Sequence, residues 1–340
     1  QMSNTSRVVS MLPSAHMYGL MFEVLYEMSC GSHVFFLSRL PSPKIIMQAL
    51  AEVKPTLVIA VPLIIEKIYK SKVKPVIEKA GMRFAMRLPG LEQVIMNKIK
   101  TELINAFGGE FIEVIIGGAA FNKEVEAFFK KMEFPFTVGY GMTECAPIIT
   151  YDGHETAKLY SCGRIVPNME MKIDSPDPQN IPGELLVRGA NVFLGYYKNE
   201  EATKEVLQED GWFHTGDMGV IDADGYLFLR GRSKCMILGP SGQNIYPEEV
   251  EAVLDTRPYV LESLVIEDNG GLTALIYPDF DLAAKEGMNQ AAFIKYMEDT
   301  LPEVNKELPN YAKLKKIEVM SEAFERTPKK SIKRYLYQRN

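Results

Sequence analysis

The sequence predicts an α/β protein with three parts: a parallel sheet covered by helices, a small β-rich subdomain, and a compact C-terminal α+β domain. Apolar strands alternate with helix-length segments over residues 1–162, which is the pattern of βαβ units. Short strands separated by Gly, Pro and Asp turns follow over 163–233. A hairpin, a helix and a further strand are expected within 234–340. We therefore expect the first two parts to form one large domain, with a boundary to the third at Arg232–Lys234.

The first part is expected to contain five strands and five helices. The predicted strands are Val8–Leu12, His33–Ser38, Thr56–Val61, Glu113–Ile116 and Phe134–Val138. The predicted helices are His16–Met28, Pro43–Val53, Ile64–Ala80, Gln93–Phe107 and Lys123–Met132. The fourth helix is followed by two glycines, a common helix stop.

The other two parts are expected to be built around hairpins. The predicted strands of the β-rich part are Glu170–Ile173, Gly183–Val187, Val220–Asp222 and Tyr226–Leu229, the last two joined by an Asp-Ala-Asp-Gly turn. The predicted elements of the last part are a helix beginning at Pro247, a hairpin of Val265–Glu267 with Thr273–Tyr277, a helix Ala291–Leu301 and a strand Lys316–Val319.

The composition is that of an ordinary globular protein. Of 340 residues, 46% are hydrophobic and 24% are charged, and the net charge of −6 gives no electrostatic case for nucleic-acid binding. The apolar runs are too short to predict a membrane-spanning helix. The four cysteines show no CxxC spacing, so we expect buried thiols in a reducing compartment and a cytoplasmic location.

Two glycine-bearing turns follow predicted strands and carry the first candidate site residues. Gly117-Gly118-Ala119-Ala120 would let the backbone approach a flat ring, although a plain helix-start turn has the same sequence. In Tyr140-Gly141-Met142-Thr143-Glu144, Tyr140 can stack on a base and Thr143 can donate to a phosphate. Glu144 offers a hard oxygen ligand to Mg²⁺.

A second pair of candidates flanks the predicted hairpin in the β-rich part. Asp217 and Arg232 are expected to lie close together, because the hairpin joins the segments that carry them. A carboxylate offers two acceptor oxygens to the vicinal hydroxyls of a ribose, and a guanidinium adds donors in a fixed fork. His214, which shortly precedes Asp217 in the sequence, is expected to be a turn residue.

In this order, YGMTE, GWFHTGD, RGRSK and SGQNIYPEEVE resemble the adenylate-forming (AMP-binding) superfamily, and within it the bacterial long-chain fatty acid–CoA ligases. The resemblance implies that Gly117, Gly118, Ala119, Tyr140 and Gly141 hold the adenine. It assigns the ribose to Asp217 with Arg232, a phosphate to Thr143 and Mg²⁺ to Glu144.

Further site residues are implied by the same resemblance. His16, in a PxxHxxG segment, would border the acyl site, although a helix-capping role is equally expected for it. Lys234 would be the hinge of a mobile C-terminal domain, which swings between two reaction poses. Gly239, Ser241 and Gly242 would belong to the loop that meets the pantetheine of CoA.

The sequence departs from the family pattern at both ends. The family's Ser/Thr/Gly-rich phosphate-binding loop does not precede the PxxHxxG segment, so we expect the chain to be a C-terminal fragment that is impaired alone. Near the other end, the catalytic lysine of the family falls on Ser331. Lys330, or Lys329 through a shifted loop, is expected to take its place.

The implied activity is a two-step ligation that uses ATP and CoA as substrates and Mg²⁺ as cofactor. A fatty acid, with long chains favoured, would become an acyl-adenylate and then an acyl-CoA thioester. Two alternatives stay open: transfer of the acyl group to an acyl carrier protein, and a nucleotide-binding pseudoenzyme without turnover. The expected partners are small molecules, with transient membrane contact compatible with lipid-soluble acids.

Overall fold

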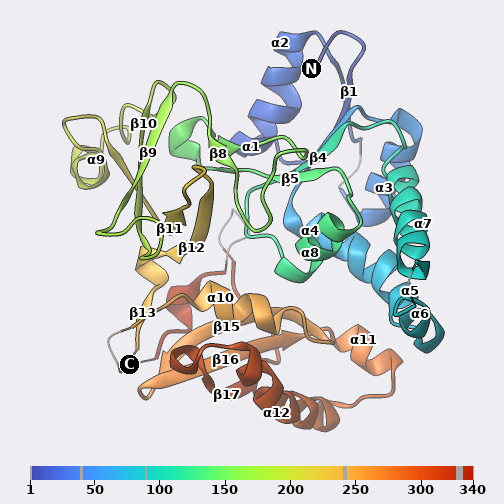
Figure 1. The fold of residues 1–340 in the computed structure, drawn as a ribbon. Coiled ribbons are helices and arrows are strands. Elements are labelled where there is room, and N and C mark those ends of the chain that lie inside the picture. Colours follow the sequence, from blue (N-terminus) through green and yellow to red (C-terminus); the bar gives the residue numbers. More distant parts are fainter. Residues whose placement is uncertain (1, 39–40, 89, 240–242, 327–331, 340) are drawn as a thin grey trace. The chain divides into compact units, whose positions relative to one another are not determined.

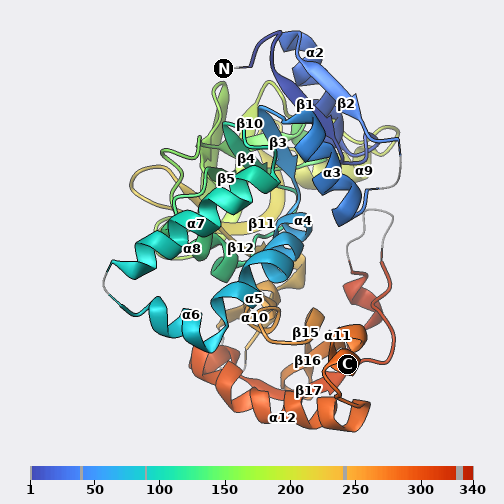
Figure 2. The ribbon, with the colours of Figure 1, turned by 90° about the vertical axis from the view of Figure 1, so that its right-hand side faces the viewer.

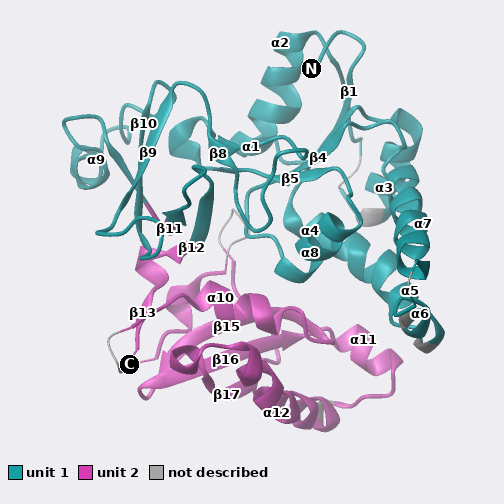
Figure 3. Ribbon diagram, viewed as in Figure 1, with its two compact units in different colours: residues 1–215, 220–229 teal, residues 216–219, 230–340 magenta. Residues whose placement is uncertain are grey.

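A computed structural model describes residues 2–38, 41–88, 90–239, 243–326 and 332–339 (Figure 1). The chain forms two compact units, residues 1–215 with 220–229 and residues 216–219 with 230–340 (Figure 3). The predicted three-part division, with its boundary at Arg232–Lys234, remains a prediction. The predicted fold class is confirmed, because parallel α/β and α+β parts are both present.

The first unit is built on short parallel strands. Strand β3 (Leu57–Ala60) pairs with β4 (Glu113–Ile116), which pairs with β5 (Phe136–Val138). Strands β1 (Arg7–Ser10) and β2 (His33–Phe36) form a second parallel pair. The N–H of Thr56 donates to the carbonyl of Arg7 at 2.8 Å, which places β1 beside the start of β3.

Both faces of these strands are covered, as the sequence predicts. The helical segments are α1 (Met17–Gly19), a π-helical segment (Leu20–Leu25), α2 (Tyr26–Cys30), α3 (Pro43–Val53), α4 (Pro62–Ile68), a second π-helical segment (Tyr69–Val73), α5 (Lys74–Ile77), α6 (Ala80–Ala85), α7 (Leu91–Ala106) and α8 (Lys123–Lys131). Helices α3, α4, α7 and α8 pack on the face that carries Val58 and Val114 (Figure 2). Because side chains alternate along a strand, Leu57 and Ile59 face the other side, toward Tyr18 and Phe22.

The β-rich part contains two small sheets. One has the strand order β12-β11-β10-β9, formed by Leu227–Arg232, Phe213–Ile221, Gly183–Gly189 and Met169–Asp174. The other joins β6 (Tyr140–Gly141), β7 (Ile148–Tyr151) and β8 (Arg164–Ile165) by antiparallel pairing. A short helix, α9, spans Glu200–Val206.

Strand β11 begins earlier than predicted, and this corrects the interpretation of His214. Phe213, Thr215 and Asp217 are buried at alternate positions, so the GWFHTGD motif runs as a strand from Phe213 onward and not as a turn. The prediction of a turn residue was wrong. His214 lies in the strand, with Nδ1 2.8 Å from a carboxylate oxygen of Glu184.

In the described part of the second unit, three α-helices pack with a three-stranded sheet. Strand β15 (Val260–Asp268) pairs antiparallel with β16 (Gly271–Pro278), and β17 (Leu314–Val319) pairs parallel with β16. The helices are α10 (Pro247–Leu254), α11 (Phe280–Lys285) and α12 (Gln290–Glu307), and a short hairpin joins β13 (Ile237–Leu238) to β14 (Asn244–Ile245). Helix α12 is longer than the predicted Ala291–Leu301, because it continues through Pro302.

A buried ion pair fixes the end of this unit. The carboxylate of Glu251 on α10 accepts from the guanidinium of Arg334 and from the N–H of Val265, the latter at 2.7 Å. Since a buried carboxylate is costly without donors, both contacts stabilise the packing of α10 on β15.

Within the described ranges, no helix is long and apolar enough to cross a membrane. The four cysteines are free thiols, but only Cys145 is buried, whereas the prediction was that all are.

Candidate functional site

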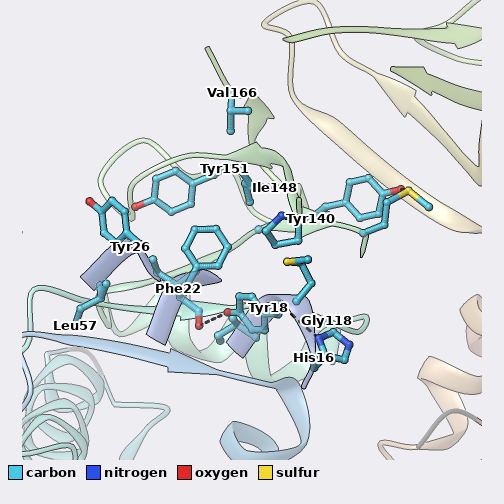
Figure 4. A pocket seen from close by; sticks show the side chains of 18 of the residues that line it. His16, Tyr18, Phe22, Tyr26, Leu57, Gly118, Tyr140, Ile148, Tyr151 and Val166 are labelled. Carbon is cyan, nitrogen blue, oxygen red and sulfur yellow. Dashed lines mark hydrogen bonds between the residues drawn. The ribbon is translucent and has the colours of Figure 1, made fainter. Parts of the chain in front are cut away.

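A pocket of about 370 Å³ lies in the first unit, on the face of β4 that is turned away from α7 and α8 (Figure 4). One end of the pocket is formed by His16, Gly117, Gly118 and the segment 139–143. Tyr18, Phe22, Ile115 and Ile148 line it further along. Most of the predicted site residues of this unit are therefore brought together at one end of a mainly apolar pocket.

Gly117 and Gly118 form the turn after β4, as predicted. A Cβ on Gly117 would come within 3.2 Å of the ring of Tyr18, and Gly118 has a φ of +86°, which disfavours other residues. Tyr18 donates its hydroxyl to the carbonyl of Ile115 at 3.2 Å, and burial raises the pKa of this phenol. Tyr18, which packs against the turn at Gly117, was not predicted as a site residue. Ala119 is exposed beyond the pocket wall.

The turn at 140–144 is held in a very tight conformation. A Cβ on Gly141 would lie 2.1 Å from the carbonyl oxygen of Pro147, so only glycine fits there. The N–H of Met142 donates to that same carbonyl at 2.8 Å. The chain then forms a 3₁₀ turn over Thr143–Cys145, which leaves Thr143 exposed at the pocket. Tyr140 is half-buried in the pocket wall.

Replacing Gly141 by alanine is expected to lower the free energy of unfolding by about 1–3 kcal/mol, because the methyl group forces the backbone of 141 away from Pro147. Chemical denaturation measures the change. Gly153→Ala is the matched control, since nothing lies within 4 Å of a Cβ there. Equal stability of the two variants would contradict the close approach at Gly141.

Glu144 is half-buried, and its Oε1 accepts from the hydroxyl of Tyr196 at 3.1 Å. This partner also was not predicted, and it comes from the loop that precedes α9. Among the described residues, no three His, Cys, Asp or Glu side chains gather as a metal site. A single carboxylate nevertheless fits Mg²⁺ that is bound together with substrate phosphates, because Mg²⁺ then needs only one or two protein ligands.

His16 has the helix-capping role that the sequence offered, and its role at an acyl site remains a prediction. It is the N-cap of α1, where its Nδ1 accepts from the N–H of Tyr18 at 3.2 Å, and it also lines the pocket. This hydrogen bond holds the imidazole of His16 beside Gly118 at the edge of the pocket (Figure 4).

Asp217 and Arg232 lie in the second unit and contact each other. Oδ1 of Asp217 is 2.9 Å from Nε of Arg232, and the carboxylate is buried while 62% of the guanidinium side chain is exposed. The hairpin of β11 and β12 thus brings the pair together as expected.

Lys234 is exposed in the 3₁₀ turn Ser233–Cys235, and the N–H of Gly239 donates to the carbonyl of Gln243 at 2.8 Å.

Several predicted residues lie outside the described part of the chain. They are Ser241, Gly242, Lys329, Lys330 and Ser331. The predictions for the CoA loop and for the catalytic lysine thus remain predictions.

Behind the pocket, a buried carboxylate ties the first π-helical segment to the end of β1. Glu23 accepts from the N–H of Met11 at 3.1 Å, from the N–H of Leu12 at 3.0 Å and from the hydroxyl of Ser10 at 3.1 Å. Burial raises the pKa of Glu23 from 4.5 to about 7, against the opposing effect of these hydrogen bonds.

Because the native state keeps the proton of Glu23 where the unfolded chain has lost it, the free energy of unfolding is expected to fall as the pH rises from about 4.5 to about 7. The loss is roughly 3 kcal/mol. Glu23→Gln mimics the protonated form and should remove this share of the decline. Denaturant unfolding at several pH values measures it. An unchanged pH dependence in the variant would contradict the raised pKa.

Comparisons with known proteins identify the family. The family model described as AMP-binding enzyme matches residues 1–197, and the model described as AMP-binding enzyme C-terminal domain matches residues 236–340. The long-chain-fatty-acid–CoA ligase ACSBG2 of Gallus gallus is 30% identical over 292 residues, which are 79% of this chain and 38% of the relative. The long-chain-fatty-acid–CoA ligase FadD15 of Mycobacterium bovis is 31% identical over 245 residues, covering 66% of this chain and 40% of the relative.

Solved structures share the fold. The O-succinylbenzoate coenzyme A synthetase of Bacillus subtilis, solved with ATP and magnesium ion, has a TM-score of 0.73 at 24% identity. The match extends over 97% of this chain and 61% of the synthetase chain. The anthranilate CoA ligase AuaEII, solved with anthranoyl-AMP, has a TM-score of 0.75 at 19% identity, with coverages of 99% and 60%. The chain spans about two fifths of the length of the two curated ligases described above.

Proposed function

Because the chain belongs to the AMP-binding enzyme family, we propose that the natural protein carrying it is an ATP-dependent fatty acid–CoA ligase that acts on long-chain acids. The observation that carries the proposal is the tight turn at Gly141, which holds Thr143 at the end of an apolar pocket and is followed by Glu144. An acid substrate needs an apolar site for its chain and polar groups for its reacting end, and the pocket offers both.

In the proposed first step, a carboxylate oxygen of the acid attacks the α-phosphorus of ATP, and the bond to pyrophosphate breaks. The work of the protein is to position the reactants and to stabilise the charge. Thr143 donates to a phosphate oxygen, Gly117, Gly118 and Tyr140 border the adenine, and Asp217 with Arg232 binds the ribose. Glu144 would hold Mg²⁺, which would supply charge neutralisation when bound.

In the proposed second step, the thiol of CoA loses its proton to solvent and its sulfur attacks the acyl carbon, and AMP departs with the bridging oxygen. Lys234 is the proposed pivot for this step, and Gly239 belongs to the proposed CoA loop. The names of the curated relatives support CoA as the acceptor.

The test uses the full natural protein with ATP, Mg²⁺, CoA and fatty acids of graded length, and mass spectrometry follows both products. Acyl-adenylate and acyl-CoA are expected, with the highest rates for long chains. Adenylate without thioester would overturn CoA as acceptor in favour of a carrier protein. Neither product, with ATP still bound, would overturn the ligase in favour of a pseudoenzyme.

A further inference from the structure

A helical arm, residues 62–88, leads away from β3 in the first unit. Its first part, residues 62–77, is one continuous stretch of α4, the second π-helical segment and α5, and α6 follows. Ile65 and Val73 are buried on the inner side, where the ring of Tyr69 packs edge-to-face on Phe128 of α8, with the centroids 5.3 Å apart. Figures 1 and 2 both show α6 at the end of the arm, away from the strands of this unit.

The charge of the arm is opposite in sign to that of the chain. Residues 67–88 contain seven Lys or Arg and a single acid, Glu78, so their formal charge is +6 in a chain whose total is −6. Glu78 lies 3.8 Å from Nζ of Lys74, with which it pairs. The exposed cations of the arm are Lys67, Lys70, Lys72, Lys79 and Arg87.

The stability of the fold does not explain this concentration of charge. Lys70 follows Lys67 by three residues, and like charges at this spacing destabilise a helix. The buried inner side already fixes the arm on the core. We therefore look for a ligand that gains from the cations on the outer side.

Exposed apolar side chains lie at the end of the arm. Phe84 of α6 is 67% exposed, Leu88 is 42% exposed, and Leu91, the first residue of α7, is 40% exposed. We call these three residues the apolar tip. The N–H of Leu88 donates to the carbonyl of Ala85 at 3.1 Å, and the N–H of Leu91 donates to the carbonyl of Leu88 at 3.2 Å, so the segment is folded in tight turns.

Cations and exposed apolar side chains together are complementary to an anionic membrane surface. Lipid phosphate groups attract the cations, and large apolar side chains gain by entering the boundary between headgroups and acyl chains. A nucleic acid would engage the cations but would leave Leu88 and Leu91 in water. The observations therefore favour a lipid surface over a nucleic acid.

We propose that the helical arm docks the protein reversibly on an anionic lipid surface. The exposed cations contact the phosphate groups of the lipids, and the apolar tip enters the layer beneath them. The docking needs neither the pocket nor a nucleotide, so it does not depend on the proposed ligase activity. If that activity holds, docking brings the protein to the phase into which long-chain acids partition.

The test is flotation of the full natural protein with two kinds of vesicle, phosphatidylcholine alone and phosphatidylcholine with phosphatidylglycerol. Binding is expected only to the vesicles with phosphatidylglycerol, and it should fall by roughly tenfold between about 0.1 M and about 0.5 M salt. Equal binding to both kinds of vesicle, or binding to neither, would overturn the proposal.

Two sets of variants locate the docking surface. Lys72→Gln combined with Lys79→Gln should lower the partition coefficient onto the anionic vesicles by roughly 10- to 30-fold. Phe84→Ser should lower it by roughly tenfold, because the side chain that enters the lipid is lost. All three side chains are exposed, so thermal unfolding of these variants should match that of the natural protein.

Matched controls change the same kinds of side chain outside the arm. Lys198→Gln combined with Lys204→Gln makes the same change of charge at exposed lysines beside and within α9. Leu194→Ser removes an apolar side chain that is 99% exposed. Both controls should leave the partition coefficient unchanged, and losses equal to those of the arm variants would refute the arm as the docking surface.

Two further readouts separate this inference from its rivals. Fluorescence anisotropy with a labelled DNA duplex tests the nucleic-acid alternative. Binding to DNA but not to vesicles, weakened by the Lys72 and Lys79 changes, would overturn the lipid assignment. Acyl-adenylate formation from a short, water-soluble acid should be the same in the arm variants and the natural protein. Lost adenylate formation with vesicle binding intact would refute the ligase and leave the docking surface standing.

Discussion

Replacing Glu144 by glutamine is expected to lower the rate of acyl-adenylate formation by roughly 100- to 1000-fold. Glutamine has the size of glutamate but offers Mg²⁺ a neutral oxygen, and metal-assisted charge neutralisation contributes several kcal/mol to the transition state. The hydrogen bond from Tyr196 at 3.1 Å holds the carboxylate of Glu144 in one orientation. Single-turnover mass spectrometry of the adenylate at several Mg²⁺ concentrations measures the effect.

Two further variants give the Glu144 prediction its controls. Glu155→Gln removes an exposed carboxylate elsewhere in the first unit and should leave the rate unchanged. Tyr196→Phe removes only the supporting hydroxyl, so its effect should be about threefold to tenfold, with a higher requirement for Mg²⁺. An adenylation rate that Glu144→Gln does not change would exclude Glu144 as the metal ligand.

Replacing Asp217 by asparagine is expected to raise the KM for ATP by roughly 10- to 100-fold with little change in kcat. Hydrogen bonds from ribose hydroxyls to a charged acceptor are stronger than those to a neutral one, and the interaction is made in both ground state and transition state. Asp217 is buried and has Nε of Arg232 at 2.9 Å, which orients the carboxylate.

A matched substrate tests whether Asp217 acts on the ribose. The natural protein should use 2′-deoxy-ATP less well than ATP, and Asp217→Asn should reduce this discrimination. Loss of structure alone would weaken both nucleotides equally. Discrimination that is the same in the variant would contradict the ribose assignment.

Much of the fold could be predicted because the signals are local. Apolar runs such as that in β3, which is buried throughout, predict strands directly, and the helices of the first unit follow the spacing of apolar residues. The start of β11 was missed because Gly211 and Gly216 resemble turn residues. Burial at alternate positions of β11 decides the structure there, and burial is a tertiary property.

The candidate site could also be predicted only in part, because its motifs are local in sequence but their supporting contacts are not. Gly117, Gly141 and Glu144 lie in short motifs whose geometry is set by neighbouring residues, so the sequence identifies them. Their partners were not predicted: Tyr18 lies far from Gly117 in sequence, and Tyr196 lies 52 residues from Glu144. Such contacts depend on how distant segments pack, and no local pattern records them.

The most direct test of the proposed chemistry is the exchange of labelled pyrophosphate into ATP, measured with the full natural protein in the presence and absence of a fatty acid. The exchange reports reversible formation of an acyl-adenylate and needs neither CoA nor a carrier protein. We predict exchange that depends on the acid and that Glu144→Gln slows by roughly 100- to 1000-fold. No exchange with any acid, in a protein that ATP still stabilises against thermal unfolding, would contradict the assignment of an adenylate-forming ligase.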